Sequence, residues 1–251
     1  MVEIASTELG RKDAPCVVFA HGWARSHADF IAIAELIAPH ARCVLLDLPG
    51  FGDSPRPDGT WGTQEYADCL RAHLNGMRVS DYIWVGHSFG ARVGLRLAAM
   101  PDSPIKALVL AGAAGVKRPV PKWKQIKGSW RSREFKRKKA QAVDEAALIA
   151  LEREYGSPDY VQSRDLGLRD IFVKTVQEDQ SDAVGAITCP TTLIYGGKDT
   201  ETPPEVGKIL HRLISNSAYI ECPEFDHLSI LTRGRHQIAM VLKEQLVGGH
   251  A

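Results

Sequence analysis

The sequence predicts an α/β fold in which a mostly parallel sheet is flanked by helices. Apolar runs that favour strands alternate with amphipathic helical stretches along most of the 251 residues. Several of these runs end in turns rich in glycine or proline, as expected where a strand leads into a helix. The alternation fails between about residues 115 and 180, which have no strand pattern. We therefore expect a core made of residues 1–114 and 186–251, with a helical insertion over residues 115–185.

The predicted strands are short apolar runs, and the predicted helices carry apolar residues at helical spacing. The strands cover residues 16–20, 43–46, 82–85, 105–111, 191–195 and 218–222. The helices of the core cover about 30–37, 63–75, 90–100, 205–213 and 237–246, and two helices of the insertion cover 145–155 and 168–176.

The overall composition excludes several classes of protein. Lys plus Arg is 31 and Asp plus Glu is 30, so the net charge of +1 argues against a generally basic nucleic-acid binder. No apolar run approaches the roughly 18 residues that span a bilayer, and the first six residues lack a secretory pattern. The five cysteines are scattered, which argues against a disulfide framework or a zinc site. We expect a cytoplasmic protein that binds neither nucleic acid nor membrane.

The strongest functional signal is Gly86-His87-Ser88-Phe89-Gly90, which follows a predicted strand and precedes a predicted helix. A serine hydroxyl is a weak nucleophile and must be exposed to a base. A sharp turn from strand to helix presents it in this way, and crowding in such a turn requires glycine on both sides. We therefore predict that Ser88 is a nucleophile. The alternative is a serine that only caps a helix.

The base and the acid that such a serine needs are predicted at His227 and Asp199. His227 follows the last strand and Asp199 follows the strand at 191–195, and loops after parallel strands share one edge of the sheet. The acid would fix the tautomer of the imidazole and stabilise its charged form. His87 would project away from the serine, so we give it a structural role. The alternatives are a surface or capping histidine and a turn aspartate.

Two backbone N–H groups are expected to form an oxyanion hole. Acyl transfer places negative charge on the carbonyl oxygen, and fixed N–H donors stabilise that charge. Phe89 directly follows the nucleophile, and Trp23 stands in the early turn His21-Gly22-Trp23. The alternative for Trp23 is a plain core side chain.

Together these motifs resemble the α/β-hydrolase superfamily, and the resemblance spans nearly the whole chain. The segments that carry it are His21-Gly22-Trp23, the loop from Asp47 to Ser54, Gly86–Gly90, Gly197-Lys198-Asp199 and Asp226-His227. The resemblance implies that the 47–54 loop is structural and that the insertion is a cap over the active site. Ala91 stands where many relatives have a second glycine. The chain before Cys16 is short, so we expect the leading hairpin to be trimmed or irregular.

The resemblance leaves more than one chemistry open. Ser88 occupies the place that an aspartate takes in dehalogenases and epoxide hydrolases, so a serine hydrolase of carboxylic esters is expected, acting through an acyl-enzyme with no metal or organic cofactor. A hydroxynitrile lyase or a cofactor-free haloperoxidase carries the same triad. Some relatives are catalytically silent binding proteins. These two alternatives stay open.

The predicted insertion is strongly basic. Between residues 117 and 139, eleven Lys and Arg residues stand against the single acid Glu134, so this stretch carries +10 and the rest of the chain −9. Trp123, Trp130 and Phe135 are interleaved with them. One interpretation is a solvated helix whose aromatic residues pack on the sheet. The other is a docking surface for an anionic substrate or an acidic partner. The resemblance favours an acidic carrier protein, because similar esterases of carrier-linked esters meet their carrier through basic cap residues.

Overall fold

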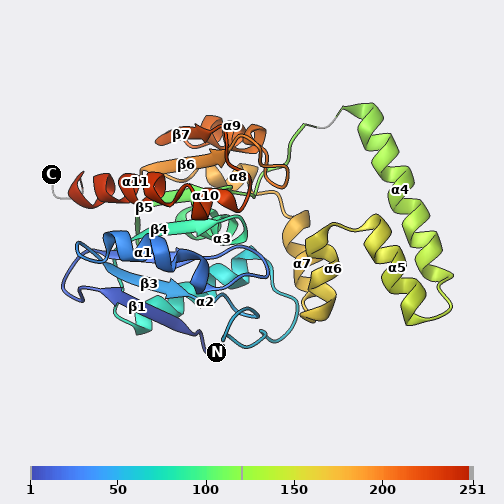
Figure 1. The fold of residues 1–251 in the computed structure, drawn as a ribbon, viewed down its shortest axis with the longest axis horizontal. Coiled ribbons are helices and arrows are strands. Elements are labelled where there is room, and N and C mark those ends of the chain that lie inside the picture. The colour runs from blue at the N-terminus through green and yellow to red at the C-terminus, as the bar shows by residue number, and fades with distance from the viewer. Residues whose placement is uncertain (1, 120, 249–251) are drawn as a thin grey trace.

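A seven-stranded sheet forms the centre of the molecule in the computed structural model, which describes residues 2–119 and 121–248 (Figure 1). The strand order is β1-β3-β2-β4-β5-β6-β7, and only the β1–β3 pair is antiparallel. The strands are β1 (Ser6–Gly10), β2 (Cys16–Ala20), β3 (Arg42–Leu46), β4 (Tyr82–His87), β5 (Ile105–Ala111), β6 (Thr191–Gly196) and β7 (Ser217–Cys222). The predicted α/β class with a mostly parallel sheet is confirmed.

Helices cover both faces of the sheet because its central strands are apolar on both sides. Val18 and Trp84 belong to one buried cluster, whereas Val17 and Val85 belong to the other. The first face is covered by α2 (Thr63–Gly76), α3 (Phe89–Ala98), α8 (Ser181–Val184) and α9 (Pro204–Leu213). The second is covered by η1 (His27–Phe30), α1 (Ile31–Ile37), α10 (Ser229–Thr232) and α11 (Arg235–Gly248).

The chain before β2 forms a single edge strand rather than a leading hairpin. β1 pairs with β3, and not with the β2 strand that follows it. Its residues are exposed or half-buried along the whole strand. An ion pair between Glu8 and Arg42, with 2.8 Å between Oε2 and Nε, ties the edge to its neighbour.

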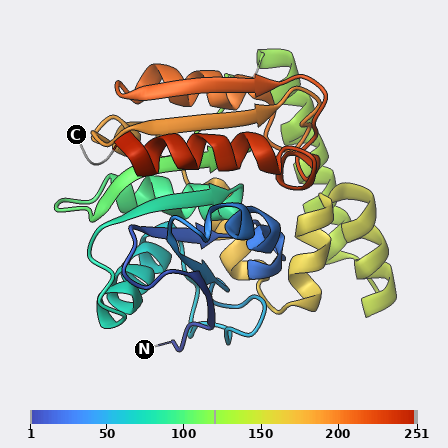
Figure 2. The same ribbon diagram turned by 60° about the vertical axis from the view of Figure 1, so that its left-hand side comes forward.

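In the described residues between β5 and β6, the regular elements are all helices. They are α4 (Lys122–Ala140), α5 (Glu145–Tyr155), α6 (Pro158–Asp165), α7 (Arg169–Gln177) and α8. Figures 1 and 2 show α6 and α7 beside the carboxyl ends of the strands, while α4 and α5 form an antiparallel pair that projects from the body. Among the described residues no helix is both long and apolar enough to cross a membrane.

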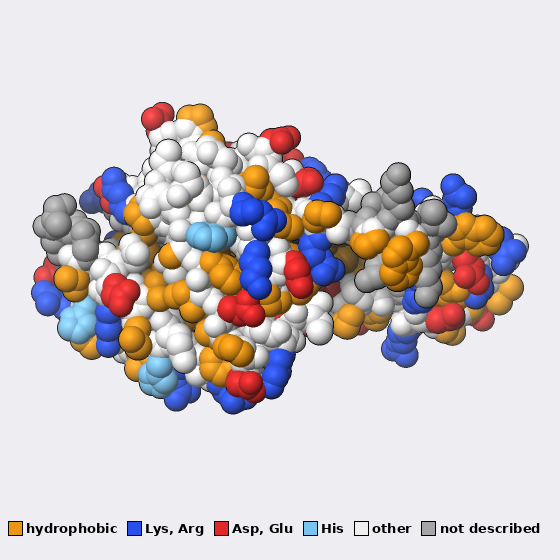
Figure 3. All heavy atoms as spheres, turned by 90° about the horizontal axis from the view of Figure 1, so that it is seen from above, with side chains coloured by type: hydrophobic (Ala, Val, Ile, Leu, Met, Phe, Trp, Pro, Cys, Tyr) orange, Lys and Arg blue, Asp and Glu red, His pale blue; other side chains and the backbone are white. Residues whose placement is uncertain are grey.

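Helix α4 packs against α5 and leaves its tryptophans exposed. The exposed fractions are 62% for Trp123 and 73% for Trp130, so these rings do not pack on the sheet and that interpretation is wrong for them. Phe135 instead stacks on Tyr155 of α5, with 5.5 Å between ring centroids. Figure 3 shows Lys, Arg and hydrophobic side chains on the lobe that α4 and α5 form. The side chains at 122, 124–128 and 248, which include Lys122, Lys124 and Lys127, lie outside the described residues.

A buried carboxylate joins the helices of the insertion. The side chain of Glu152 in α5 is 2% exposed and accepts hydrogen bonds from Arg169 (2.8 and 3.0 Å) and Arg164 (3.0 Å). The guanidinium of Arg169 also lies over the ring of Tyr160, 3.7 Å from its centroid. The hydrogen bonds from Arg169 and then Arg164 outweigh burial and lower the pKa of Glu152 to about 2.

Candidate functional site

Ser88 stands at a sharp turn where β4 ends and α3 begins. Its backbone adopts φ 48° and ψ −104°, a strained conformation for a residue with a side chain. A Cβ on Gly90 would lie 2.1 Å from the carbonyl oxygen of Ala20, and one on Gly86 would lie 2.6 Å from the backbone of Ala91. Both glycines are therefore required by close packing of the backbone, and the turn exposes Ser88 at the start of a helix whose N-terminal N–H groups favour negative charge.

His227 and Asp199 lie against each other at the carboxyl edge of the sheet. The distance from His227 Nδ1 to Asp199 Oδ2 is 2.7 Å, and the residues are 7% and 3% exposed. The N–H groups of Glu201 (2.9 Å) and Thr202 (2.8 Å) donate to Asp199 Oδ1. Because an ionised carboxylate only accepts, Nδ1 of His227 carries the proton, and Nε2 is left as the basic nitrogen.

The surroundings of His227 keep its imidazole basic. Burial lowers the pKa of His227, but the hydrogen bond to Asp199 and the charges of Asp199, Glu201 and Asp159 outweigh burial and leave it raised. Glu201 Oε2 lies 3.5 Å from Nε2, on the side of the ring opposite Asp199. Asp159 comes from α6, and burial together with the charge of Glu201 raises the pKa of its carboxyl group.

His87 contacts both the backbone and the ring of His227. Its Nε2 lies 2.9 Å from the backbone oxygen of His227, and the two ring centroids are 4.6 Å apart. Burial lowers the pKa of His87 to about 3, so the ring is neutral and its Nε2–H donates to that oxygen. This contact fits the structural role that the sequence predicts for it.

Trp23 and Phe89 line the same cavity as Ser88. Neither backbone N–H donates a hydrogen bond to another residue in the described part of the chain. The ring of Trp23 is 8% exposed and packs edge-on against Phe89 (5.3 Å) and Phe172 of α7 (5.0 Å). Trp23 therefore has the buried ring of a core residue, and its backbone N–H has no acceptor among the described residues.

Two cavities meet at Ser88, and Trp23, Asp159 and Glu201 line both of them. The first has a volume of about 160 Å³ and is called the His227 cavity because His227 lines it, with His87, Arg25 and Gln162. The second has about 190 Å³ and is called the Arg92 cavity, since Arg92 lines it with Phe89, Phe172, Thr175 and Val176. Helix α6 thus contributes to the walls of both cavities, and helix α7 contributes to the Arg92 cavity.

Sequence reasoning missed four contributors to this site. Thr202 Oγ1 lies 3.0 Å from Asp199 Oδ2 and 3.1 Å from His227 Nδ1. Glu201 Oε2 lies 3.5 Å from the other ring nitrogen of His227. Arg92 had a usable signal, because residues four apart on a helix share a face and Ser88 precedes it by four. Asp159 had no such signal, since only the packing of α6 brings it to the site.

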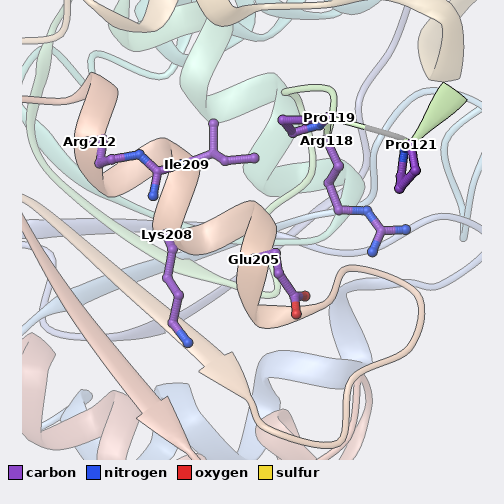
Figure 4. Close-up of a pocket in the computed structure, with 7 residues that line it drawn as sticks. All are labelled: Arg118, Pro119, Pro121, Glu205, Lys208, Ile209 and Arg212. Atoms are coloured by element: carbon purple, nitrogen blue, oxygen red, sulfur yellow. The ribbon is translucent and has the colours of Figure 1, made fainter.

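A separate cleft of about 440 Å³ lies between the segment that leads into α4 and helix α9 (Figure 4). Arg118, Lys208 and Arg212 line it, with Glu205 as the acid. In Figure 4 the side-chain ends of Lys208 and Arg212 lie apart from that of Arg118, and Lys208 is paired with Glu221 at 3.0 Å. The cations do not converge on one point. Nor do the described residues contain a group of three or more His, Cys, Asp or Glu arranged to hold a metal.

Comparison with known proteins places these features in a family context. A family model described as alpha/beta hydrolase fold matches residues 15–147. The pimeloyl-[acyl-carrier protein] methyl ester esterase of Chromobacterium violaceum is 27% identical over 238 residues, which cover 87% of this chain and 89% of that protein. The bifunctional esterase/perhydrolase DCH of Acinetobacter calcoaceticus is 27% identical over 247 residues, or 90% of each chain. A thermophilic esterase from Thermogutta terrifontis is similar in fold, with a TM-score of 0.73 and 21% identity over 100% of this chain and 95% of that one.

Proposed function

Because the chain belongs to the α/β-hydrolase family, we propose that it is a serine hydrolase that cleaves carboxylic esters through an acyl-enzyme. The observation that carries the proposal is the strained turn at Ser88, which opens onto a cavity that His227 also lines. Esterases among the relatives support the same class of reaction.

The proposed mechanism begins with attack by Ser88 Oγ on the ester carbonyl. His227 Nε2 accepts the proton of the hydroxyl as the C–O bond forms, and Asp199 stabilises the resulting imidazolium through Nδ1–H. The imidazolium then gives the proton to the departing alcohol. Water, deprotonated by the same nitrogen, attacks the acyl-enzyme and releases the carboxylic acid and Ser88.

The backbone N–H groups of Trp23 and Phe89 would hold the oxyanion of each tetrahedral intermediate. Both lack an acceptor among the described residues, and both flank the nucleophile. One such donor contributes about 3 kcal/mol of transition-state stabilisation in serine hydrolases. A side-chain substitution at Trp23 leaves the N–H in place, so it should change which substrates fit more than it changes the oxyanion contact.

The decisive experiment replaces the nucleophile. Ser88→Ala should abolish turnover of p-nitrophenyl esters and labelling by an organophosphate probe, with the labelled peptide of the unmodified enzyme containing Ser88. Ser80→Ala, which removes an exposed hydroxyl, is the matched control and should keep both activities. Labelling at another residue would contradict the assignment. Cleavage of cyanohydrins or oxidation of halide, without ester hydrolysis, would favour a lyase or a haloperoxidase instead.

We propose that residues 115–185 act as a cap. Asp159 and Gln162 of α6 and Phe172 of α7 line the cavities at Ser88, which supports a roof over the reacting atoms. A cap of this kind excludes water and selects substrates by shape.

We also propose that the basic face of α4 binds an acidic carrier protein that bears the ester. Arg133, Lys136 and Arg137 are exposed on this helix, near the exposed ring of Trp130. A cationic surface of this kind steers an anionic partner, and an exposed tryptophan supplies apolar contact area. The relative that acts on an acyl-carrier-protein methyl ester supports a carrier-linked substrate.

A further inference from the structure

The two cavities at Ser88 receive different halves of an ester, if the hydrolase mechanism proposed above holds. His227 Nε2 must protonate the departing alcohol, so the alcohol leaves through the His227 cavity. The acyl group then extends to the other side of Ser88. That side is the Arg92 cavity, which begins at Phe89 and is roofed by Phe172, Thr175 and Val176 of α7.

Arg92 places a positive charge in the acyl half of the site. It lies one helical turn after Ser88 on α3, and its side chain is half-buried. Nη1 donates to the carbonyl oxygens of Thr175 and Glu178. Across the described residues, Nε and Nη2 donate no hydrogen bond and the guanidinium forms no ion pair within 4 Å. The guanidinium therefore keeps donors for a ligand.

The carboxylates nearest to Arg92 are already engaged elsewhere. The charges of Glu178 and Asp179 act on Arg92 and partly offset the effect of burial, which lowers its pKa. Both oxygens of Glu178, however, accept hydrogen bonds from Thr63, and Asp179 accepts from Ser181. Several other arginines are paired with a carboxylate, as Arg25 is with Asp29 at 2.6 Å and Arg42 is with Glu8 at 2.8 Å. A half-buried guanidinium without a carboxylate partner favours an anion that comes from outside.

We propose that Arg92 binds a carboxylate at the far end of the acyl chain, so that the enzyme prefers half-esters of short dicarboxylic acids. Asp159 and Glu201 line the boundary between the cavities and repel a carboxylate there. They therefore favour the orientation in which the anionic end lies at Arg92 and the ester carbonyl at Ser88. The four-residue spacing along α3 limits the acyl group to a few carbons between its two ends.

The test compares two methyl esters that differ at one end. Monomethyl succinate carries a carboxylate where methyl levulinate carries a neutral acetyl group of similar shape. We expect kcat/KM of the unmodified enzyme to favour the succinate ester, and Arg92→Leu to reduce that ratio about ten- to a hundredfold. Arg92→Lys keeps the positive charge, so it should reduce that ratio less than Arg92→Leu does. Arg96→Leu is the matched control, since Arg96 is half-buried one turn later, donates to Thr63 and does not line the cavity.

Thermal unfolding of each variant separates a binding role from a structural one, because Arg92 also holds the backbone of α7. If Arg92→Leu is less stable but keeps the preference for the succinate ester, the proposal is overturned. Calorimetry of succinate binding to the Ser88→Ala protein tests binding without turnover. The double variant Ser88→Ala/Arg92→Leu should bind succinate with a Kd at least tenfold higher. Binding that depends on Arg92 without hydrolysis of any ester would overturn the proposed function alone. Hydrolysis with an unchanged substrate ratio would overturn the role of Arg92 alone.

Discussion

His227 lies between two carboxylates that act on opposite nitrogens of its ring. Asp199 holds Nδ1 at 2.7 Å, in a buried position, and Glu201 lies 3.5 Å from Nε2 and is largely exposed. The first contact orients the imidazole. The second acts on the nitrogen that accepts the proton in the proposed mechanism, so the charge of Glu201 tunes the basicity of His227.

The pH dependence of hydrolysis should report this tuning. His227 is a base only when neutral, and its pKa is raised, so kcat/KM rises with pH through that raised value. Glu201→Gln removes a charge that favours the imidazolium, and should move the acidic limb of the profile to lower pH. Glu205→Gln, an exposed change at the start of α9, is the control and should leave the limb in place. An unmoved limb in Glu201→Gln would contradict the role given to Glu201.

At the scale of elements, a buried ion-pair network joins three helices of the insertion. Glu152 is buried on α5, while its partners Arg164 and Arg169 come from α6 and the start of α7. The pair of α6 and α7 in turn positions Asp159 and Phe172 at Ser88. Loss of this network should loosen the roof of the site before it affects the sheet.

Glu152→Gln should destabilise the insertion by about 2 kcal/mol at neutral pH, because it removes charged hydrogen bonds to two arginines. The pKa of Glu152 is lowered to about 2, so the stabilisation is complete above its usual value near 4.3 and is lost as pH falls toward 2. Limited proteolysis across residues 141–144, between α4 and α5, and urea unfolding measure the effect. Glu154→Gln, an exposed change on the same helix, should be neutral. Equal proteolysis of the two variants would argue against a role for the network.

At the scale of the whole molecule, the net charge of +1 hides a basic lobe and an acidic remainder. The lobe projects beyond the end of the sheet that carries Ser88 (Figure 2). None of the described charged side chains of α4 and α5 lines the cavities at Ser88. An acidic partner at α4 would therefore deliver its ester from outside the site, and its contribution should depend on ionic strength.

Charge reversal on α4 tests this arrangement. Replacing Arg133, Lys136 and Arg137 by Glu should reduce the ratio of kcat/KM for a carrier-linked ester to that for the free ester at least tenfold. Rising salt should reduce the same ratio in the unmodified enzyme, since exposed charges are screened. Reversal of Lys12, Arg78 and Lys243, which are exposed on the core, is the control. A ratio that is insensitive to both changes would contradict docking on α4.

The sequence determined six of the seven strands, the family and the placement of Ser88, Asp199 and His227 at one edge of the sheet, but not the edge strand β1. Strand periodicity and the order of the motifs are local properties, and parallel topology alone brings the ends of β4, β6 and β7 together. The tertiary structure decided what surrounds them. Asp159 lies 71 positions from Ser88 in the chain and reaches the site only through the packing of α6, and Trp130 is exposed because α4 has no sheet beneath it. The free donors of Arg92 likewise depend on where α7 crosses α3, because side-chain contacts between distant elements are set by packing and not by local spacing.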